Sequence, residues 1–578
     1  MGELHEECGV VAIYHLSTGN TSPLCPAGGP GEVSRLVPRM LLDLQHRGQL
    51  SAGVTSYNPA RPRPLETYKE IGTVSEAFHQ NHREQFKKIM DVLAGPAAIG
   101  HVRYATSGRD DVNYAHPFER PHIKKNKWFS FAFNGQLANY EDEKKKLLQL
   151  DPNSCFTRNS DSEIFMHYLC AAVKEGERDL TQVCRKTILH SDNTIRLDGA
   201  YTLVYLNALG EMFVARDPHG IKPLCYAFDG NLFAAASESV ALFNLGFEPN
   251  EIKDVKPGEI IVVKPGAKEV VDGVEKVVSQ PSVTVDRYVE PKRPAPCFFE
   301  WIYFANAASI LDGKSVYLAR HRLGEALAEQ EIVKCAVRRG EKIDPKSRER
   351  LELAPEEKKD LIVVPVPDTS RAAAEGMAFR LGVPCLEGLM RNRYSGRTFI
   401  EGNDTRGSKA KTKYTPLPEV LEGKRVLLVE DSIVRSTTMR VLIERIKTIG
   451  KAREIHIRVA CPPIVSPCFY GIDMSTYSEL FAPRHLLRKY GIEGVDSDEA
   501  LARKWKMTPE IEEEMAKDLG CDSLHYLQPR DVSTALRIPG MELCQACVNW
   551  EYPTEWGCRL ASEARKNFIE GVTERTYD

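Results

Sequence analysis

The residues that could do chemistry begin at position 8. Cys8 stands between a short polar stretch, GELHEE, and an apolar run, GVVAIYHL. Two interpretations of this cysteine differ completely in chemistry. Either Cys8 is a buried thiol at the start of a strand, or it is a nucleophile that is exposed when residues 1–7 are removed. The rest of the sequence has to decide between them.

A second candidate lies in VLLVEDSIVRSTTM (426–439), where an apolar strand is followed by two carboxylates and a hydroxyl-rich loop. In an open α/β sheet, ligands bind at the carboxyl ends of the strands, and the free N–H groups of a helix N-terminus suit a phosphate. Glu430 and Asp431 would hold sugar hydroxyls or a hydrated Mg²⁺ ion there. The same residue types form an ordinary N-cap, so both interpretations remain open. The candidate loop residues are Ser432, Arg435, Ser436, Thr437 and Thr438.

A third candidate is the pair Cys544 and Cys547 in ELCQACVNW, the one C-x-x-C spacing in the chain. Such a pair can be redox-active, half of a zinc site or incidental. The chain has 15 cysteines. In a reducing compartment we expect these to be thiols, metal ligands or nucleophiles, because a disulfide framework does not persist there.

The composition is that of a globular enzyme. The chain has 578 residues, of which 42% are hydrophobic and 27% charged, and its net charge is -3. This length predicts roughly two to four domains, and the balanced charge predicts neither a nucleic-acid nor a membrane partner. There is no apolar run of spanning length and no basic-then-apolar signal peptide at the N-terminus. We therefore expect a cytoplasmic enzyme.

The elements that must position these residues change character along the chain. Residues 8–285 read as short alternating β-runs with few helices, which predicts a layered α+β domain. A Pro-rich segment, 289–297, leads to a region (286–480) in which strands alternate with helices, as in a parallel α/β sheet. Residues 481–578 are predicted to form a helical C-terminal region, and 340–360 to form a charged insertion. In the helix after the hydroxyl-rich loop, the predicted buried face is Met439, Leu442, Ile443 and Ile446, with Gly450 as its stop.

Two further stretches give the loop its chemistry. VEDSIVRSTT together with RNRYSGRTFIEG (391–402) resembles the sequence signature of the glutamine phosphoribosylpyrophosphate (PRPP) amidotransferase family. The resemblance implies that Arg391, Arg393 and Arg397 neutralise pyrophosphate, a task that suits the planar guanidinium fork. VPVPDTS (364–370) matches the pyrophosphate-side loop, which implies that Thr369 holds Mg²⁺ together with Glu430 and Asp431.

The N-terminal motifs are similar to those of N-terminal-nucleophile glutamine amidotransferases. These motifs are EECGVVAI, QHRGQLSAG (45–53), GHVRYATSG (100–108), FNGQLANY (133–140) and SDSE (160–163). The resemblance implies a four-layer αββα domain and a propeptide, residues 1–7, whose removal makes Cys8 the nucleophile. The physics supports this, because the freed α-amine, with a pKa of about 8, can act as the nearby base.

The remaining glutamine-site roles follow from the same resemblance. It implies that Asn134 and the backbone of Gly135 form the oxyanion hole. Arg103 would bind the glutamine carboxylate and Asp161 its ammonium group. His101 and His46 invite a catalytic assignment, but we expect both to be structural.

One branch of the family carries a [4Fe–4S] cluster. Its ligand contexts resemble those of Cys297, Cys468, Cys544 and Cys547, and four thiolates meet the usual ligand count. We expect a structural cluster, with zinc or an empty site as the alternative. Cys461 and Cys558 stay unassigned.

The resemblance predicts coupled amidotransfer from glutamine to PRPP through an ammonia channel, inhibition by purine nucleotides and a homotetramer. Three departures from the family pattern stand out. Glu430 replaces an aspartate, Ser436 replaces a glycine, and FANAASILDG (304–313) keeps only Ser309 of an Arg-Pro-Asp-Ser run. The rival functions are a glutamine amidotransferase with another acceptor, and a regulatory protein that binds PRPP or nucleotide without turnover.

Overall fold

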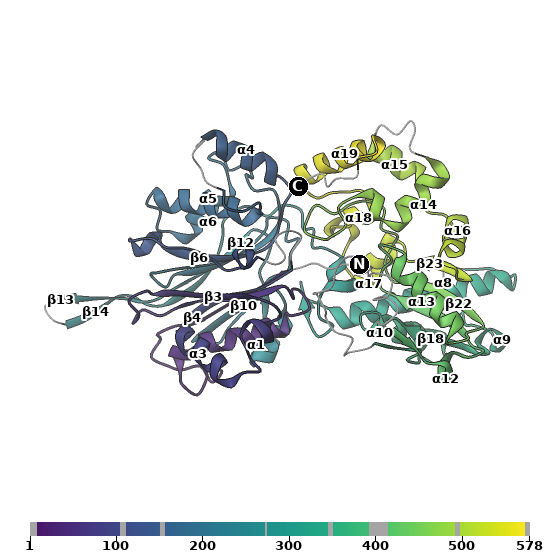
Figure 1. Cartoon of the computed structure of the whole chain (residues 1–578), viewed down its shortest axis with the longest axis horizontal. Helices are drawn as coiled ribbons and strands as arrows, with labels where there is room; N and C mark the ends of the chain where they lie inside the picture. Colours follow the sequence, from purple (N-terminus) through teal and green to yellow (C-terminus); the bar gives the residue numbers. More distant parts are fainter. Residues whose placement is uncertain are drawn as a thin grey trace.

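The structure is a computed structural model that describes residues 8–104, 111–150, 156–271, 274–344, 351–391, 414–491 and 497–572. Two bodies of secondary structure lie side by side, an N-terminal half with two stacked sheets and a second half around a parallel sheet (Figure 1). Within the described ranges, no helix has the length and apolar character that crossing a membrane requires.

The N-terminal half contains two antiparallel sheets. The first sheet has the order β11-β9-β10-β1-β4-β2-β3. Its strands are β1 (Gly9–His15), β2 (Ser51–Tyr57), β3 (Leu65–Ile71), β4 (Ala97–Arg103), β9 (Cys225–Phe228), β10 (Leu232–Ala236) and β11 (Lys253–Asp254). The second sheet has the order β15-β12-β8-β7-β6-β5. Its strands are β5 (Phe118–Arg120), β6 (Phe129–Leu137), β7 (Gly199–Asn207), β8 (Met212–Arg216), β12 (Glu259–Lys264) and β15 (Ser282–Arg287).

Side-chain alternation builds the layers of this half. In β1, Val10 and Ala12 belong to the core between the two sheets, whereas Val11 and Ile13 face the helices outside the first sheet. A strand presents successive side chains to opposite faces, so a strand covered on both sides reads as continuously apolar. Figure 1 shows helices on both outer faces, which confirms the predicted four-layer αββα arrangement. The covering helices are α1 (Val37–Asp43), α3 (Arg83–Leu93) and α7 (Ser239–Leu245) on one side, and α4 (Tyr140–Leu150), α5 (Asp161–Lys174) and α6 (Leu180–Ile188) on the other.

The second half is built on a parallel sheet, as predicted. Its order is β18 (Leu361–Pro365), β21 (Arg425–Glu430), β22 (Glu454–Val459) and β23 (Ser523–Tyr526). The large helices around it are α8 (Val316–Arg338), α10 (Arg371–Leu381) and α13 (Thr437–Thr448). Met439, Leu442, Ile443 and Ile446 are the buried residues of α13, which is the predicted face. The helix ends just before Gly450, where the predicted stop stands.

The C-terminal region is less purely helical than predicted. It contains the helices α14 (Phe481–Tyr490), α15 (Asp498–Lys504), α16 (Pro509–Leu519), α17 (Pro529–Leu536), α18 (Ala546–Asn549) and α19 (Glu555–Ile569). Between α16 and α17 it also supplies β23, which pairs with β22 and extends the parallel sheet. The four residues of β23, SLHY, are too few to give a periodic signal. Region 481–578 therefore shares the sheet of the region before it.

The described residues also form several shorter elements. These are α2 (Val74–Ala77), α9 (Pro355–Lys358), α12 (Pro418–Leu421), β13 (Ala267–Val271), β14 (Val274–Ser279), β16 (Ile310–Leu311), β17 (Lys314–Ser315), β19 (Leu389–Arg391), β20 (Tyr414–Pro416) and a single π-helical turn, η4 (Glu300–Phe304).

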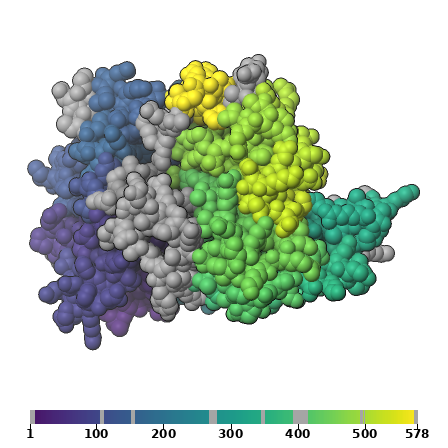
Figure 2. All heavy atoms as spheres, turned by 45° about the vertical axis from the view of Figure 1, so that its right-hand side comes forward, coloured from purple at the N-terminus to yellow at the C-terminus, as the bar shows by residue number. Residues whose placement is uncertain are grey.

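Three kinds of contact join the two halves. The Arg216 guanidinium binds the Asp312 carboxylate at 2.7 and 2.9 Å. Near the C-terminus, the Trp556 amide donates to Asp198 at 3.1 Å, and Figure 2 shows α19, in yellow, between the blue and green surfaces. The third contact is made by η4, which follows the Pro-rich link and packs on α8. Its Glu300 accepts a hydrogen bond from Arg47 of the N-terminal half at 2.9 Å. The halves therefore form one continuous body around η4.

Candidate active sites

The first candidate site surrounds Cys8, which directly precedes β1. Its thiol is half-buried and lies 3.5 Å from the carbonyl oxygen of Tyr104, just past the end of β4. The pairing of β1 with β4 also brings Arg103 close, because Gly9 lies opposite Val102. Burial lowers the pKa of Arg103, and the electrostatic interaction with Cys8 opposes that shift. A half-buried thiol and a buried cation thus share one end of the first sheet.

Asn134 and Gly135 lie in β6 of the facing sheet. Asn134 is fully buried, and neither its side-chain nitrogen nor its oxygen has a hydrogen-bond partner within the described chain. An unpaired buried amide costs about 1–3 kcal/mol, so this side chain is suited to receive a ligand. Gly135 has a φ of 153°, and a Cβ there would lie 2.0 Å from the Ala200 carbonyl oxygen. Only glycine fits, which keeps the backbone beside Asn134 fixed against β7.

Two buried histidines fix the residue that precedes Asn134. Their rings stack with centroids 4.3 Å apart. The His101 Nε2 lies 3.0 Å from the Phe133 carbonyl oxygen, to which it donates, and the Phe133 amide donates to His116 Nδ1 at 3.4 Å. Burial lowers the pKa of His101 to about 3 and that of His116 well below its ordinary value. Both rings therefore stay neutral, and the geometry gives His101 the structural role that we expected.

Asp161 begins α5 and reaches back to β6. Its Oδ2 accepts a hydrogen bond from the Leu137 amide at 2.8 Å. Arg103 lies over the Tyr114 ring at 5.5 Å and interacts electrostatically with Lys69, whose pKa falls to about 8 chiefly through burial. The site thus offers a carboxylate on one element and cations on two others. This separation suits a zwitterionic amino acid.

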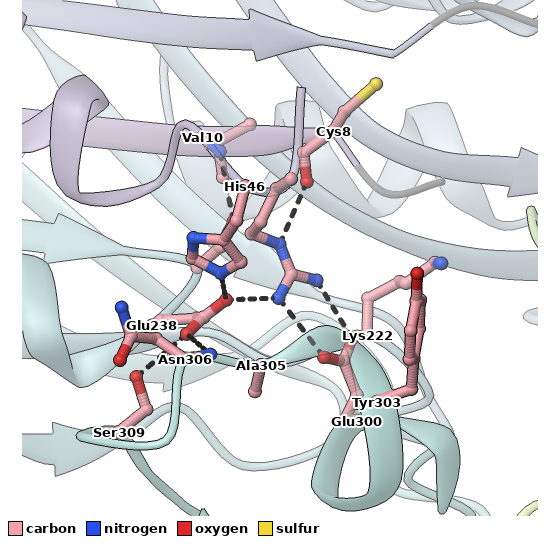
Figure 3. Close-up of polar contacts among 12 residues, drawn as sticks. Cys8, Val10, His46, Lys222, Glu238, Glu300, Tyr303, Ala305, Asn306 and Ser309 are labelled. Atoms are coloured by element: carbon pink, nitrogen blue, oxygen red, sulfur yellow. Dashed lines mark hydrogen bonds and ion pairs between the residues drawn. The ribbon is translucent and has the colours of Figure 1, made fainter. Parts of the chain in front are cut away.

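A buried charge network lies beneath Cys8 (Figure 3). The Arg47 Nε donates to the Cys8 carbonyl oxygen at 3.3 Å. The other guanidinium nitrogens of Arg47 bind Glu238 at 2.6 Å and Glu300 at 2.9 and 3.1 Å. His46 lies 2.6 Å from Glu238, so this histidine holds the network, in line with the structural role predicted for it. Sequence reasoning missed Arg47, although the QHRG motif contains it, and it missed both glutamates.

The second candidate site lies at the carboxyl edge of the parallel sheet. The Val366 amide donates to Val429 at 2.9 Å, so the loops after β18 and β21 start side by side. This brings the turn that contains Thr369 beside Glu430 and Asp431. Arg391 joins the same edge by donating to Asp368 at 2.8 Å. Arg393 and Arg397 lie outside the described residues, and their role in binding pyrophosphate stays a prediction.

The hydroxyl-rich loop opens α13 as expected. Ser432 donates to Asp431 at 2.8 Å, Ser436 is buried, and Thr437 and Thr438 are the first residues of the helix. Arg435 makes contacts within the chain, and its role in binding PRPP stays a prediction. Its guanidinium pairs with Glu479 and donates to the Asp473 carbonyl at 2.9 Å, which anchors the loop to the segment before α14.

A further arginine reaches the loop from a distant segment. The Arg484 guanidinium, on α14, lies 3.4 Å from the Ser436 hydroxyl. No sequence signal connects residues so far apart along the chain.

The carboxylates make this edge negative. Burial raises the pKa of Tyr303, and the charges of Asp431 and Glu430 add to that shift. Burial also raises the pKa of Tyr414, with Glu430 as the largest charge effect. Oxygen ligands of this kind are those that Mg²⁺ prefers.

The four predicted cluster cysteines converge at the junction. Each is buried, with at most 7% of its surface exposed. Cys297 and Cys544 form a parallel bridge, and Cys547 interacts electrostatically with Cys468, Cys297 and Cys544. Cys547 also interacts electrostatically with Cys461, whereas Cys558 is exposed. Among the described residues, however, no three His, Cys, Asp or Glu side chains are grouped tightly enough to hold a metal ion.

Comparison with known proteins identifies both halves. Family models match residues 116–244 as a glutamine amidotransferase domain and 341–465 as a phosphoribosyl transferase domain. Amidophosphoribosyltransferases from Methanothermobacter thermautotrophicus and Methanocaldococcus jannaschii are 33% and 34% identical, covering 96% and 95% of this chain and 95% and 98% of their own. The chain belongs to the amidophosphoribosyltransferase family.

A solved amidotransferase supports the same assignment. The glutamine PRPP amidotransferase from B. subtilis, complexed with ADP and GMP, has a TM-score of 0.70 and 29% identity, and covers 95% of this chain and 98% of its own. Amidophosphoribosyltransferase membership confirms the resemblance noted from the motifs and the two-domain enzyme that it implied. It also disfavours the regulatory protein without turnover. The iron–sulfur cluster, the propeptide and the tetramer stay predictions.

The two histidines predict an acid-labile N-terminal half. Because the folded pKa of His101 is about 3 and lies below its unfolded value, the unfolded chain binds the proton first as the pH falls. The stabilisation that depends on neutral His101 is therefore fully present above pH of about 6.5. It is lost as the pH falls toward 3, which lowers the free energy of unfolding by on the order of 3–5 kcal/mol. We expect the melting temperature to fall through this window, and less steeply in His101→Gln. The exposed His122→Gln is the matched control, and equal slopes in both variants would contradict the assignment.

Proposed function

We propose that this chain converts glutamine, PRPP and water into 5-phosphoribosylamine, glutamate and pyrophosphate, the first committed step of de novo purine synthesis. The observation that carries the proposal is the unpaired, buried amide of Asn134 facing the sheet that holds Cys8, in the same chain as a loop of carboxylates and hydroxyls at a parallel sheet edge. A glutaminase alone would not need the loop of carboxylates and hydroxyls, and a phosphoribosyl site alone would not need the buried amide of Asn134. Together they provide a donor half and an acceptor half.

At the first site, the Cys8 thiolate attacks the amide carbon of glutamine. The Asn134 side chain and the Gly135 amide stabilise the oxyanion that forms, while Arg103 and Asp161 bind the carboxylate and ammonium ends. The C–N bond then breaks, ammonia leaves, and water hydrolyses the Cys8 thioester to glutamate. We infer that residues 1–7 are removed, because the α-amine of Cys8 can serve as the base only when it is free.

At the second site, ammonia attacks C1 of the ribose and pyrophosphate leaves. The N–H groups at the start of α13, with Ser436, Thr437 and Thr438, bind the 5-phosphate. Glu430 and Asp431 hold the ribose hydroxyls, and Arg391 neutralises pyrophosphate. Thr369, Glu430 and Asp431 would hold Mg²⁺, which supplies further charge neutralisation when it is bound. The ammonia passes through the interior, because in water it would be protonated and lose its nucleophilicity.

Regulation and assembly belong to the same proposal. The B. subtilis relative was solved with ADP and GMP, which supports purine nucleotides as inhibitors of this chain. We infer a homotetramer from the family resemblance alone.

The test is to purify the chain anaerobically and measure glutamate and pyrophosphate released from glutamine with Mg²⁺ and PRPP. The control omits PRPP. Pyrophosphate formed in step with glutamate, with little glutamate in the control, supports coupled transfer. Glutamate release that is indifferent to PRPP would show that the acceptor is another molecule.

Replacement of Asn134 separates catalysis from folding. We expect Asn134→Ala to lower glutamine-dependent turnover by about 10²–10³-fold, the loss found when an oxyanion donor is removed. Its melting temperature should not fall, because the side chain makes no hydrogen bond that could be lost. Pyrophosphate release driven by added ammonium chloride should persist. A variant that loses ammonia-driven activity as well would contradict the assignment of Asn134 to the glutamine site.

We also propose that Cys297, Cys468, Cys544 and Cys547 hold a structural [4Fe–4S] cluster. Their burial, their convergence from three separate segments and their soft sulfur chemistry support this assignment. The four thiolates would hold the cluster, and four is the usual ligand count of such a group. The cluster would tie the C-terminal segment to the junction near Cys297.

The cluster predicts a brown protein. After anaerobic purification, we expect about four irons per chain and broad visible absorption, both lost in Cys547→Ser. The exposed Cys558→Ser is the matched control and should keep both. A colourless wild-type protein that contains zinc would overturn the iron assignment.

A further inference from the structure

The Glu238 carboxylate accepts four hydrogen bonds at the junction of the two halves. It is fully buried, with an exposed fraction of 0%. Its Oε1 accepts from His46 and from Arg47, each at 2.6 Å. Its Oε2 accepts from the Asn306 amide and from the Ser309 hydroxyl, each at 2.8 Å. One oxygen thus serves the N-terminal half and the other serves the turn that follows η4 (Figure 3).

Toward the N-terminal half, Glu238 orients Arg47, the residue that binds the backbone of Cys8. Arg47 is fully engaged, with Nε on the Cys8 carbonyl oxygen and its terminal nitrogens on Glu238 and Glu300. Burial alone would raise the pKa of Glu238, but the charges of His46 and Arg47 outweigh it and the pKa is lowered. Glu238 is therefore a permanent anion. A movement of this carboxylate would be transmitted to Cys8 through the guanidinium of Arg47.

Toward the second half, the same network extends through Glu300 and Arg320 to the phosphoribosyl site. Glu300 is the first residue of η4, and the Arg320 guanidinium, on α8, binds the carbonyl oxygens of Trp301, Tyr303 and Ala305 at 2.9, 3.1 and 2.7 Å. Arg320 is buried and interacts electrostatically with Asp431 as well as with Glu238 and Glu300. Arg320 therefore contacts the backbone of the 301–305 segment directly and interacts electrostatically with carboxylates on both sides of it.

We propose that Glu238 is a positioning residue that couples the two sites. It fixes the Cys8 carbonyl, through Arg47, to the 300–309 segment, so that ligand binding near Asp431 sets the geometry of Cys8. This inference rests on the proposed function, since it assumes that glutamine and PRPP are the two ligands. Glu238 touches neither of them.

The charge of Glu238 is essential to this role. All four partners donate a hydrogen to it, and only a carboxylate accepts at both oxygens. In Glu238→Gln the side chain keeps its shape, but its amide nitrogen is a donor and must face either Arg47 and His46 or Asn306 and Ser309. In both orientations the hydrogen bonds to one pair of donors are lost, so the side chain no longer joins the two halves.

The experiment compares three rates in wild type and Glu238→Gln. These are glutamate release without PRPP, glutamate release with saturating PRPP, and pyrophosphate release driven by ammonium chloride. We expect the PRPP stimulation of glutamate release to fall about tenfold or more in the variant, the size expected for losing a hydrogen bond to a charged group. The KM for glutamine should rise. Ammonia-driven pyrophosphate release should stay within about twofold of wild type, because the phosphoribosyl site does not use Glu238.

Two further variants keep the test decisive. Asn306→Ala is the matched control, because Asn306 reaches Glu238 through its backbone amide, and it should behave as wild type. Ser309→Ala removes one donor and should give a smaller loss of stimulation. Wild-type stimulation in Glu238→Gln overturns the inference. If Glu238→Gln fails to fold, wild-type stimulation in Ser309→Ala overturns it instead. A wild-type enzyme that releases no pyrophosphate from PRPP and ammonia refutes the proposed function itself.

Discussion

A guanidinium buried between two carboxylates holds the two halves of this enzyme together. Moving charges out of water costs several kcal/mol per ion, and only well-formed hydrogen bonds offset that cost. Arg47 meets this condition through Cys8, Glu238 and Glu300. Burial raises the pKa of Glu300, and Arg47 opposes the shift, whereas Glu238 remains fully charged. A network of this kind contributes little net stability for its cost, but it tolerates only one relative position of the segments that supply it.

Both sites use backbone geometry to place a few reactive groups. At the glutamine site, two neutral imidazoles and a glycine without room for a Cβ fix the strand around Asn134, so that its amide remains buried and unpaired. At the phosphoribosyl site, parallel strands deliver carboxylates to one edge and the helix after them presents its N–H groups. In each case the surrounding fold bears the cost of holding a polar group ready for a ligand.

The sequence allowed much of this to be predicted. Continuous apolar runs such as β1, and the 3.6-residue period of α13, are local patterns whose burial follows directly from their geometry. The motifs around Cys8 and Asp431 carry their chemistry in adjacent residues. The role of Glu238 could not be predicted, since its four donors come from two segments that lie far from it and from each other along the chain. For the same reason the pairing of Arg435 with Glu479 was not foreseen.

Residues 304–313 depart from the family's sequence pattern, and the contacts of this turn with Glu238 explain which residue of the pattern is kept. Glu238 binds this turn through the backbone amide of Asn306 and the hydroxyl of Ser309. The side chain of Asn306 accepts a hydrogen bond from the Ala308 amide, within the turn. Asn306 thus contacts Glu238 through its backbone amide, whereas a change at Ser309 would remove a side-chain donor from a fully buried anion. The one residue of the run that survives is the one whose side chain the junction uses.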